Sequence, residues 1–517
     1  MPQIRVHEKA LAHLSRGLYR SPASALRELV SNAWDANATQ VLIATNYPNF
    51  AQISVQDNGD GFSGPEFEKL MAGGIGNSEK RNVDEPLIHT RPLIGRLGIG
   101  LLGIAQICGS FEVSSKPKKG EAFRARVRLY DLIRERLDID DPEIVKENGL
   151  AEGVREVDVG EYEFLPVEKN GLSRGTNITS DDIHPTFMRS FRESRSPEVA
   201  PKFKEPPLEW SKCLTVISQV HTLHELGDYW KLLWELSASC PIPYASSDAV
   251  PQGAIKDIQK RLVEYEFTTR VDGITLAKPV RLRGNKGGYT VERIPHTSKN
   301  VYGRNLEFEG YVAVQEGQQL KPDELRGIMI RIKNVGVGYY DPSFLDYPFN
   351  EGPRAKWVTG EVYVGAGLED ALNVDRDSFN RFHPEFRTLQ QHLHEVLRRK
   401  VFPEVYKKLS SRSADREAER QELRTSELQQ IVSTSLGAKV KVRRFSSSAE
   451  REAVAVNQTR DQVQITFGDL SQLRTKKAQR QLAASILALY DIASRERGAE
   501  QQRERFEELL LALLSRW

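Results

Sequence analysis

SPASALRELVSNAWDA, residues 21–36, is the stretch of this chain that says most about its fold. Ser21 suits the N-cap of a helix and Pro22 suits its first turn, so a helix is predicted to begin here. The residues spaced to face a core along this helix are apolar, and they are Leu26, Leu29, Val30 and Ala33. The pattern therefore predicts a helix packed against the body of a folded domain.

Three polar residues interrupt this apolar helix. Glu28, Asn32 and Asp35 follow one another at offsets of four and then three, which places them on one face. A partly exposed polar edge is the simpler interpretation of these three residues. Two carboxylates and an amide on one stripe of an otherwise apolar helix are, however, an unusual way to build a solvated surface.

A strand and a glycine turn follow about twenty residues later. Residues 52–55 (QISV) alternate in the manner of a strand and lead into DNGDGF at 57–62. Asp57, Gly59 and Gly61 form a DxGxG pattern, which in most proteins marks only a hairpin or a loop.

Further glycines recur in two segments and at one more strand. The segments are GGIGNSEK at 73–80 and IGRLGIGLLG at 94–103, and GTNIT at 175–179 reads as a short strand entered through a glycine. Glycines spaced in this way before a helical pattern suit a loop whose backbone amides wrap a phosphate.

These elements, in this order and spacing, resemble the ATP-binding domain shared by gyrases, heat-shock chaperones, histidine kinases and MutL-type mismatch-repair proteins, the GHKL superfamily. The resemblance covers roughly residues 15–185 and is strongest to the ninety-kilodalton heat-shock chaperones and the microrchidia ATPases. It implies an α/β sandwich domain that binds ATP with Mg²⁺ and hydrolyses it.

The resemblance also implies residue roles. Glu28 is the expected general base or water-orienting group, Asn32 offers its amide oxygen to Mg²⁺, and Asp57 accepts the adenine amino group. Asp35 is expected to hold the helix against the lid. The other residues expected to bind or neutralise the nucleotide are Gly59, Gly61, Lys80, Gly95, Gly98, Ile99, Gly100 and Thr176.

Two other nucleotide-binding patterns do not explain these glycines. GIGLLG at 98–103 satisfies the dinucleotide-binding GxGxxG pattern, but that motif requires a preceding strand, and residues 91–96 (RPLIGR) make a poor one. The GxxxxGK[ST] loop of the P-loop ATPases does not occur in the sequence, so that class is excluded.

The predicted fold class is α+β and multidomain. The expected parts are the ATP-binding domain at 1–185 with a lid near 64–95, a linker and helical segment at 186–255, an α+β transducer (middle) domain at 256–380, and a mostly helical, basic C-terminal region at 381–517 with a short β section near 438–467. In more detail, we expect an embellishment of the sheet at 131–174, a linker at 183–207 and a strand at 262–268.

The end of the second domain carries another motif. GLEDALNVDRD at 367–377 resembles the middle-domain stretch in which the heat-shock chaperones place an arginine on the γ-phosphate, which gives that role to Arg376. The alternative is that Arg376 only satisfies a neighbouring Asp375 or Asp377. Lys333, in a strand-and-turn at 330–334, is a second candidate for the catalytic cation.

Composition limits the compartment and the cofactors. Cys108, Cys213 and Cys240 are widely spaced, which argues against zinc and against a disulfide scaffold and fits a reducing cytoplasm. No apolar run approaches the length of a membrane span, and no signal-peptide core is evident near the N-terminus. We therefore expect a cytoplasmic protein without membrane segments.

The net charge of +2 hides an asymmetry. From residue 381 onward there are 26 Lys and Arg against 18 Asp and Glu, whereas the first 380 residues hold 47 against 53. The basic residues cluster at Lys439, Lys441, Arg443 and Arg444, and again at Arg474, Lys476, Lys477 and Arg480. Such clusters bind nucleic acids or other polyanions, or they form a solvated face, and no aromatic residues are interleaved with them.

Three classes of function compete for this domain order. The first is an ATP-gated homodimeric clamp of the chaperone or microrchidia kind, slow in turnover, which closes on a protein client or a nucleic acid. The second is a nucleic-acid-associated ATPase subunit for repair, topology or phage defence that partners a separate effector. A histidine kinase is disfavoured because the ATP-binding domain comes first and no phosphoacceptor helix precedes it.

Overall fold

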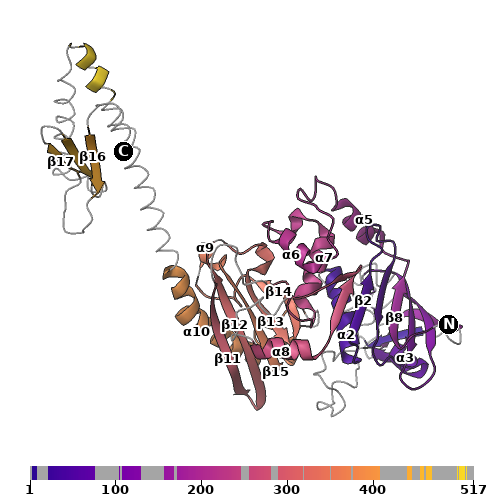
Figure 1. Ribbon diagram of the computed structural model, residues 1–517. Coiled ribbons are helices and arrows are strands. Elements are labelled where there is room, and N and C mark those ends of the chain that lie inside the picture. The colour runs from indigo at the N-terminus through magenta and orange to yellow at the C-terminus, as the bar shows by residue number, and fades with distance from the viewer. Residues whose placement is uncertain are drawn as a thin grey trace, which may run out of the picture. The chain divides into compact units, whose positions relative to one another are not determined.

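The computed structural model describes residues 3–7, 21–75, 104, 107–129, 156–167, 172–245, 256–280, 289–317, 319–349, 351–373, 377–407, 439–444, 454–458 and 462–467, with further positions between 498 and 508. The chain divides into two compact units, Met1–Val405 and Tyr406–Trp517. Figure 1 shows the elements of both.

A ten-stranded mixed sheet organises the N-terminal half of the first unit. Its strand order is β10-β9-β2-β3-β8-β5-β6-β7-β1-β4. The strands are β1 Gln3–His7, β2 Gln40–Ala44, β3 Ile53–Asp57, β4 Ala72–Ile75, β5 Ser110–Lys116, β6 Phe123–Leu129, β7 Glu156–Leu165, β8 Gly175–Ser180, β9 Thr268–Val271 and β10 Ile274–Thr275. β3 and β8 pair antiparallel, so the end of β3 meets the beginning of β8.

The helix predicted from residues 21–36 is confirmed as α2, Pro22–Asp35. The Ser21 hydroxyl caps it by accepting the amide of Ser24 at 3.3 Å, and Pro22 occupies the first turn. The helix ends where Asn37 takes a left-handed backbone conformation, with φ of 58°. Its apolar residues are buried in the core, so burial as well as local propensity holds α2 in place.

The other helices of this part are α3 Gly64–Met71, α5 Pro185–Glu193, α6 Trp210–Ile217, α7 Asp228–Ser239 and α8 Lys256–Glu264, with a 3₁₀ turn at Leu223–Glu225. α7 packs against α2 on one side and against strand β14 of a second sheet on the other (Figure 1). This arrangement places α7 between the helix of interest and the second domain.

The second sheet has the strand order β11-β12-β15-β13-β14. Its strands are β11 Tyr289–Val301, β12 Arg304–Gln315, β13 Gly327–Ile332, β14 Val335–Asp341 and β15 Val358–Ala366, and the associated helical elements are η5 Asp323–Leu325, α9 Gly352–Ala355, η6 Glu369–Ala371, α10 Pro384–Val396 and a π-helical turn at Leu397–Val401. β13 pairs parallel with β15, and the other neighbours are antiparallel.

A buried polar cluster joins this sheet to the segments beside α7 and β10. The carboxylate of Glu361 on β15 accepts two hydrogen bonds from the Arg331 guanidinium, at 3.1 and 2.5 Å. It also accepts hydroxyl hydrogen bonds from Tyr244, Tyr311, Tyr340 and Tyr363. Tyr244 follows α7, and its backbone forms an isolated parallel β-bridge with Lys278, which follows β10. Burial would raise the pKa of Glu361, but the charges of Arg331 and Lys278 and these hydrogen bonds hold it down, to about 2.

The second unit contains a three-stranded sheet in the order β16-β18-β17. The strands are β16 Lys439–Arg444, β17 Val454–Gln458 and β18 Gln462–Phe467. They lie within the stretch near 438–467 where a β section is expected. α10 lies at the start of the region expected to be mostly helical after residue 381, and beyond residue 407 most of that region lies outside the described residues.

One expectation about the second domain is wrong. Residues 262–268 do not form a strand; α8 runs to Glu264, because Ile258 and Leu262 are four residues apart and both buried, as in a helix. β9 then pairs parallel with β2, so the chain beyond 256 still contributes to the first sheet. Aromatic side chains strengthen this link, since the rings of Tyr265 and Phe267 contact Trp34 of α2 edge to face.

Two further segments contain regular elements that the sequence did not specify. Within the expected linker at 183–207, α5 forms and packs Phe191 against Phe50, with ring centroids 4.4 Å apart. Within 131–174, β7 pairs with both β6 and β1 and is an interior strand of the sheet. Alternating charged residues on β7 conceal this strand from a search for apolar runs.

The described part of the expected lid is also regular. Ser63 and Glu66 form a capping box at the start of α3, and Phe67 and Met71 bury one face of that helix. β4 follows at once and pairs parallel with β1. The rest of the expected lid, to residue 95, lies outside the described residues. No described helix combines the length and the apolar character that crossing a membrane requires.

Candidate functional site

The polar stripe of α2 is buried. Glu28 is 3% exposed and Asp35 is 5% exposed, whereas Asn32 between them is half-buried. A solvated polar edge would leave these side chains in water, so the simpler interpretation of the stripe does not hold for the two carboxylates. Asp35 also has interaction partners in the structure.

Arg27, beside Glu28, forms the ion pairs of this helix. Its guanidinium lies 3.4 Å from Glu28 Oε1 and 2.6 Å from Asp377 Oδ1. The second oxygen of Asp377 accepts the hydroxyl of Ser24 at 2.9 Å. The side chains of Arg27 and Asp377 are 3% and 1% exposed, so this contact is shielded from water and salt. Asp377 thus pairs with α2, 350 residues earlier in the sequence.

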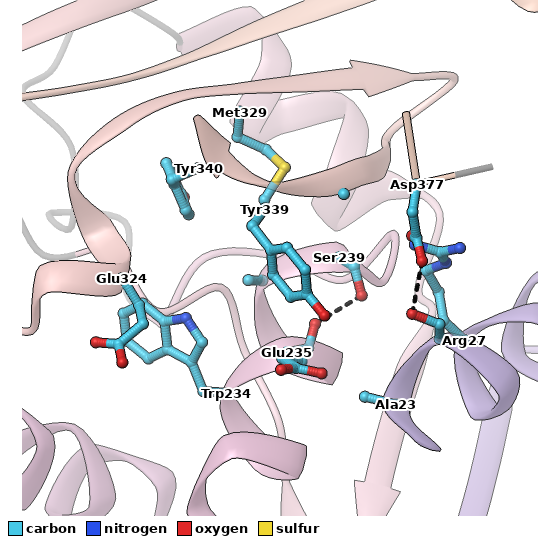
Figure 2. Close-up of a pocket in the computed structure, with 13 residues that line it drawn as sticks. Ala23, Arg27, Trp234, Glu235, Ser239, Glu324, Met329, Tyr339, Tyr340 and Asp377 are labelled. Carbon is cyan, nitrogen blue, oxygen red and sulfur yellow. Dashed lines mark hydrogen bonds and ion pairs between the residues drawn. The ribbon is translucent and has the colours of Figure 1, made fainter. Parts of the chain in front are cut away.

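A second carboxyl group lies at the same end of α2. The Ser21 hydroxyl donates to Glu235 Oε2 of α7 at 2.6 Å. Burial raises the pKa of Glu235 to about 7; the charge of Asp377 acts in the same direction and the Ser21 hydrogen bond opposes it. Figure 2 shows Arg27 and Asp377 on one side of a small cavity and Glu235 near Tyr339 on another. The cavity holds about 20 Å³.

Asp57 ends β3 and faces the start of β8. Its Oδ1 accepts the backbone amide of Gly59 at 2.8 Å and that of Thr176 at 3.3 Å. Burial raises the pKa of the Asp57 carboxyl, and the two amides act in the opposite direction by favouring the charged form. Both amides bind the same oxygen, so that, among the residues the structure describes, Oδ2 is the carboxylate oxygen available to a donor from a ligand.

Close backbone contacts shape the turn around Asp57. A Cβ at Gly59 would lie 2.6 Å from the carbonyl oxygen of Ala36, at the end of α2. Gly175 has φ of 111°, and a Cβ there would lie 2.0 Å from the carbonyl oxygen of Asp57. Gly61 continues the same turn with φ of 64°. These contacts require glycine and hold α2, β3 and β8 together around one carboxylate.

Ser115 on β5, which the sequence did not single out, supports Thr176. The two hydroxyls lie 3.2 Å apart. Ser115 also donates to the carbonyl of Gly175 at 3.1 Å and accepts the amide of Phe62 at 3.0 Å. It thereby ties the glycine turn to β8. Only its inward position in an alternating strand could have suggested it.

The predicted residues do not all come together. The structure gathers Asp57, Gly59 and Thr176 in one hydrogen-bonded turn, with Glu28, Asn32 and Asp35 on the adjacent helix. Lys80, Gly95, Gly98, Ile99, Gly100 and Arg376 lie outside the described residues.

Lys333 lies in the β13–β14 turn with φ of 48°. Its Nζ is 3.4 Å from Glu369 Oε1. It lines a cavity of about 140 Å³ with Tyr265, His296 and Tyr363, and this cavity shares no lining residue with the one beside Arg27.

The sequence signals for the second-domain contacts were weak. Arg27 and Ser24 lie within the decisive helix but were interpreted as neither site nor contact. The sequence indicates Asp377 only as a neighbour of Arg376, and Glu235 only as part of the helical segment at 186–255. Chain separation explains these omissions, because each contact joins residues more than 200 positions apart.

Residues 19–147 match a family model described as "Histidine kinase-, DNA gyrase B-, and HSP90-like ATPase". This match supports an ATPase domain of the GHKL superfamily in the N-terminal part of the chain, and with it ATP binding. A protein of Herpetosiphon aurantiacus named "Putative type II restriction enzyme HgiDII" is 40% identical over 105 residues. The aligned segment covers 20% of this chain and 16% of that protein, so the likeness concerns one segment of each.

Asp57→Asn tests the turn. We expect it to weaken adenine-nucleotide binding by about 10- to 100-fold, because the amide would turn a donor toward the adenine amino group in place of an acceptor. Titration calorimetry with an ATP analogue measures this. The matched control is Asp60→Asn, the same change three residues on, where the carboxylate pairs with Asn37 and Arg174. Equal affinities of the two variants would contradict the assignment.

Proposed function

We propose that this chain is a Mg²⁺-dependent ATPase whose turnover is gated by contact between its ATP-binding domain and its second domain. The observation that carries the proposal is the Asp57 carboxylate, fixed by two backbone amides in a glycine turn that packs against the end of α2. That turn and α2 both lie within the segment matched by the ATPase family model.

The residues present fit a magnesium–triphosphate. Asn32 is half-buried and offers an amide oxygen beside the carboxylates of Glu28 and Asp35, and oxygen donors are what Mg²⁺ accepts. Bound Mg²⁺ would supply neutralisation of phosphate charge. The amides of Gly95, Gly98, Ile99 and Gly100 and the charge of Lys80 are assigned to the phosphates.

Glu28 is assigned to the attacking water. Its burial excludes bulk solvent, so a single water held by its carboxylate can be oriented and can transfer its proton there. Arg27, 3.4 Å away, fixes the direction of that carboxylate. The protein contributes mainly by positioning the water and the phosphates, because phosphoryl transfer requires little covalent chemistry from the enzyme.

The gating proposal rests on Asp377. This residue directly follows Arg376, which we assign to the γ-phosphate, with Lys333 as the second candidate cation. Asp377 also holds Arg27, the neighbour of Glu28. One ion pair therefore holds both Asp377, the sequence neighbour of Arg376, and the helix that carries the proposed general base. We propose that hydrolysis requires this contact to be formed, which makes turnover slow.

Glu28→Gln separates binding from chemistry. We expect the variant to bind ATP within about threefold of wild type and to lose hydrolysis by about 10²- to 10⁴-fold, because the amide cannot accept a proton from water. Phosphate release and nucleotide titration measure the two effects. Exposed Glu264→Gln is the control. Retained hydrolysis would remove Glu28 from the general-base role.

A double-mutant cycle tests the gate. Asp377→Asn and Arg27→Gln should each lower kcat by more than about tenfold with ATP affinity nearly unchanged, and the double variant should be no worse than Arg27→Gln alone, because both changes break one contact. Steady-state ATPase assays give kcat, and nucleotide titration gives the ATP affinity. Additive losses in kcat, or losses confined to ATP affinity, would refute a shared gating contact.

For the biological role we propose a homodimeric, ATP-gated clamp of the chaperone or microrchidia kind. The order of an ATP-binding part, an α+β second sheet and a further C-terminal unit supports it. The second candidate is a nucleic-acid-associated ATPase subunit. Its support is the basic C-terminal third and the printed name of the Herpetosiphon protein, which applies to that protein and to one aligned segment here.

Light scattering and ATPase assays distinguish the two candidates. A clamp should double its molar mass when a non-hydrolysable ATP analogue is added. A nucleic-acid-dependent ATPase should be stimulated by DNA, and the stimulation should fall steeply with salt. A chain that stays monomeric with the analogue contradicts the clamp, and ATPase activity unaffected by DNA contradicts the second candidate.

A further inference from the structure

The three-stranded sheet of the C-terminal unit carries positive charge without negative charge. Its strand β16 contains Lys439, Lys441, Arg443 and Arg444, and none of the residues in β16, β17 or β18 is acidic. Residues 439–480 as a whole hold ten Lys and Arg against four Asp and Glu. Segments of this composition attract polyanions.

The register divides these residues between the two faces of the sheet. Lys439, Lys441 and Arg443 alternate along β16 and so share one face, opposite Gln462, Gln464 and Thr466 of β18. Asn457 of β17 continues that row from Gln464. The other face carries Val440 and Val442 beside Val463 and Ile465, and Arg444 falls on this apolar face.

We propose that the polar face of this sheet, defined by Lys439, Lys441, Arg443, Gln462 and Gln464, binds the phosphodiester backbone of a nucleic acid. Residues on alternate positions of a strand are about 6.7 Å apart, a spacing comparable to that of successive phosphates in an extended nucleotide strand. β16 lies at the edge of the sheet, so the row of cations follows its rim.

The neighbouring rows suit the same ligand. Glutamine and asparagine amides donate to phosphate and sugar oxygens, and such contacts position a protein on a nucleic acid without reading its sequence. The strand residues on this face include no aromatic side chain for base stacking. Binding is therefore driven by phosphate contacts, is indifferent to sequence and depends strongly on salt.

The test uses the full-length protein without nucleotide, so that it is independent of the ATP site. Fluorescence anisotropy is measured with labelled single-stranded DNA, duplex DNA and RNA of about 20 residues, from about 50 to about 200 mM salt. The central comparison is Arg443→Gln against Arg444→Gln: adjacent residues, the same chemical change, and opposite faces of one strand.

We expect Arg443→Gln to weaken binding about 5- to 8-fold at about 0.1 M salt and to reduce the salt slope by about 0.7–0.9. Arg444→Gln should stay within about twofold of wild type. The triple variant Lys439→Gln, Lys441→Gln, Arg443→Gln should reduce the slope by about 2 to 3 with ATP binding unchanged. Of single-stranded DNA, duplex DNA and RNA, the one whose affinity falls most in the triple variant is the preferred ligand of this face.

Three results would overturn the proposal. The first is that the wild-type protein binds none of the three nucleic acids. Equal losses for Arg443→Gln and Arg444→Gln would show that net charge, and not the polar face, governs binding. Poly-glutamate that competes as well as DNA would indicate an acidic protein partner instead. Failure of any of these arms leaves the Asp57 and Glu28 experiments unaffected, because they measure nucleotide binding and hydrolysis in the other unit.

Discussion

The ion pair between Arg27 and Asp377 is the constraint on which the arrangement of the first unit depends. Both side chains are almost completely removed from water, and a buried charge that loses its partner destabilises a protein by about 3–5 kcal/mol. α2 can therefore keep Arg27 in the core only while the segment around Asp377 lies against it. The contact also restricts how the second domain lies on the helix, because a charge-assisted hydrogen bond is selective for geometry.

The same helix combines two requirements that usually conflict. Its apolar residues fix it in the core, and its buried polar residues each need a partner there. Arg27, Ser24 and Ser21 obtain partners from the second domain and from α7. Residues that break the local pattern of an amphipathic helix are expected at sites where function depends on them. In this chain they lie on the helix to which we assign ATP hydrolysis.

Much of the first sheet was predictable because its signals are local. The cap and first turn of α2, the strands around Val55 and Ile178, and the glycine turn after Asp57 follow from neighbouring residues. β7 was missed although its charged and apolar residues alternate as in a strand, because the charged residues leave no apolar run. The Arg27–Asp377 pair and the return of β9 to β2 were not predictable, because both depend on residues more than 200 positions apart. Glu28, Asn32 and Asp57 were selected by pattern, and the structure adds the burial and the amide contacts that the pattern lacked.

The late return of β9 and β10 also protects the first sheet from self-association. β2 has β9 on its outer side, and β10, only two residues long, is the outermost strand. Very short edge strands offer few free backbone groups to another chain. A polypeptide that ended near residue 255 would expose the whole length of β2 instead. Such a fragment would be prone to aggregate through strand pairing, so the ATP-binding part is complete only when the chain has passed residue 275.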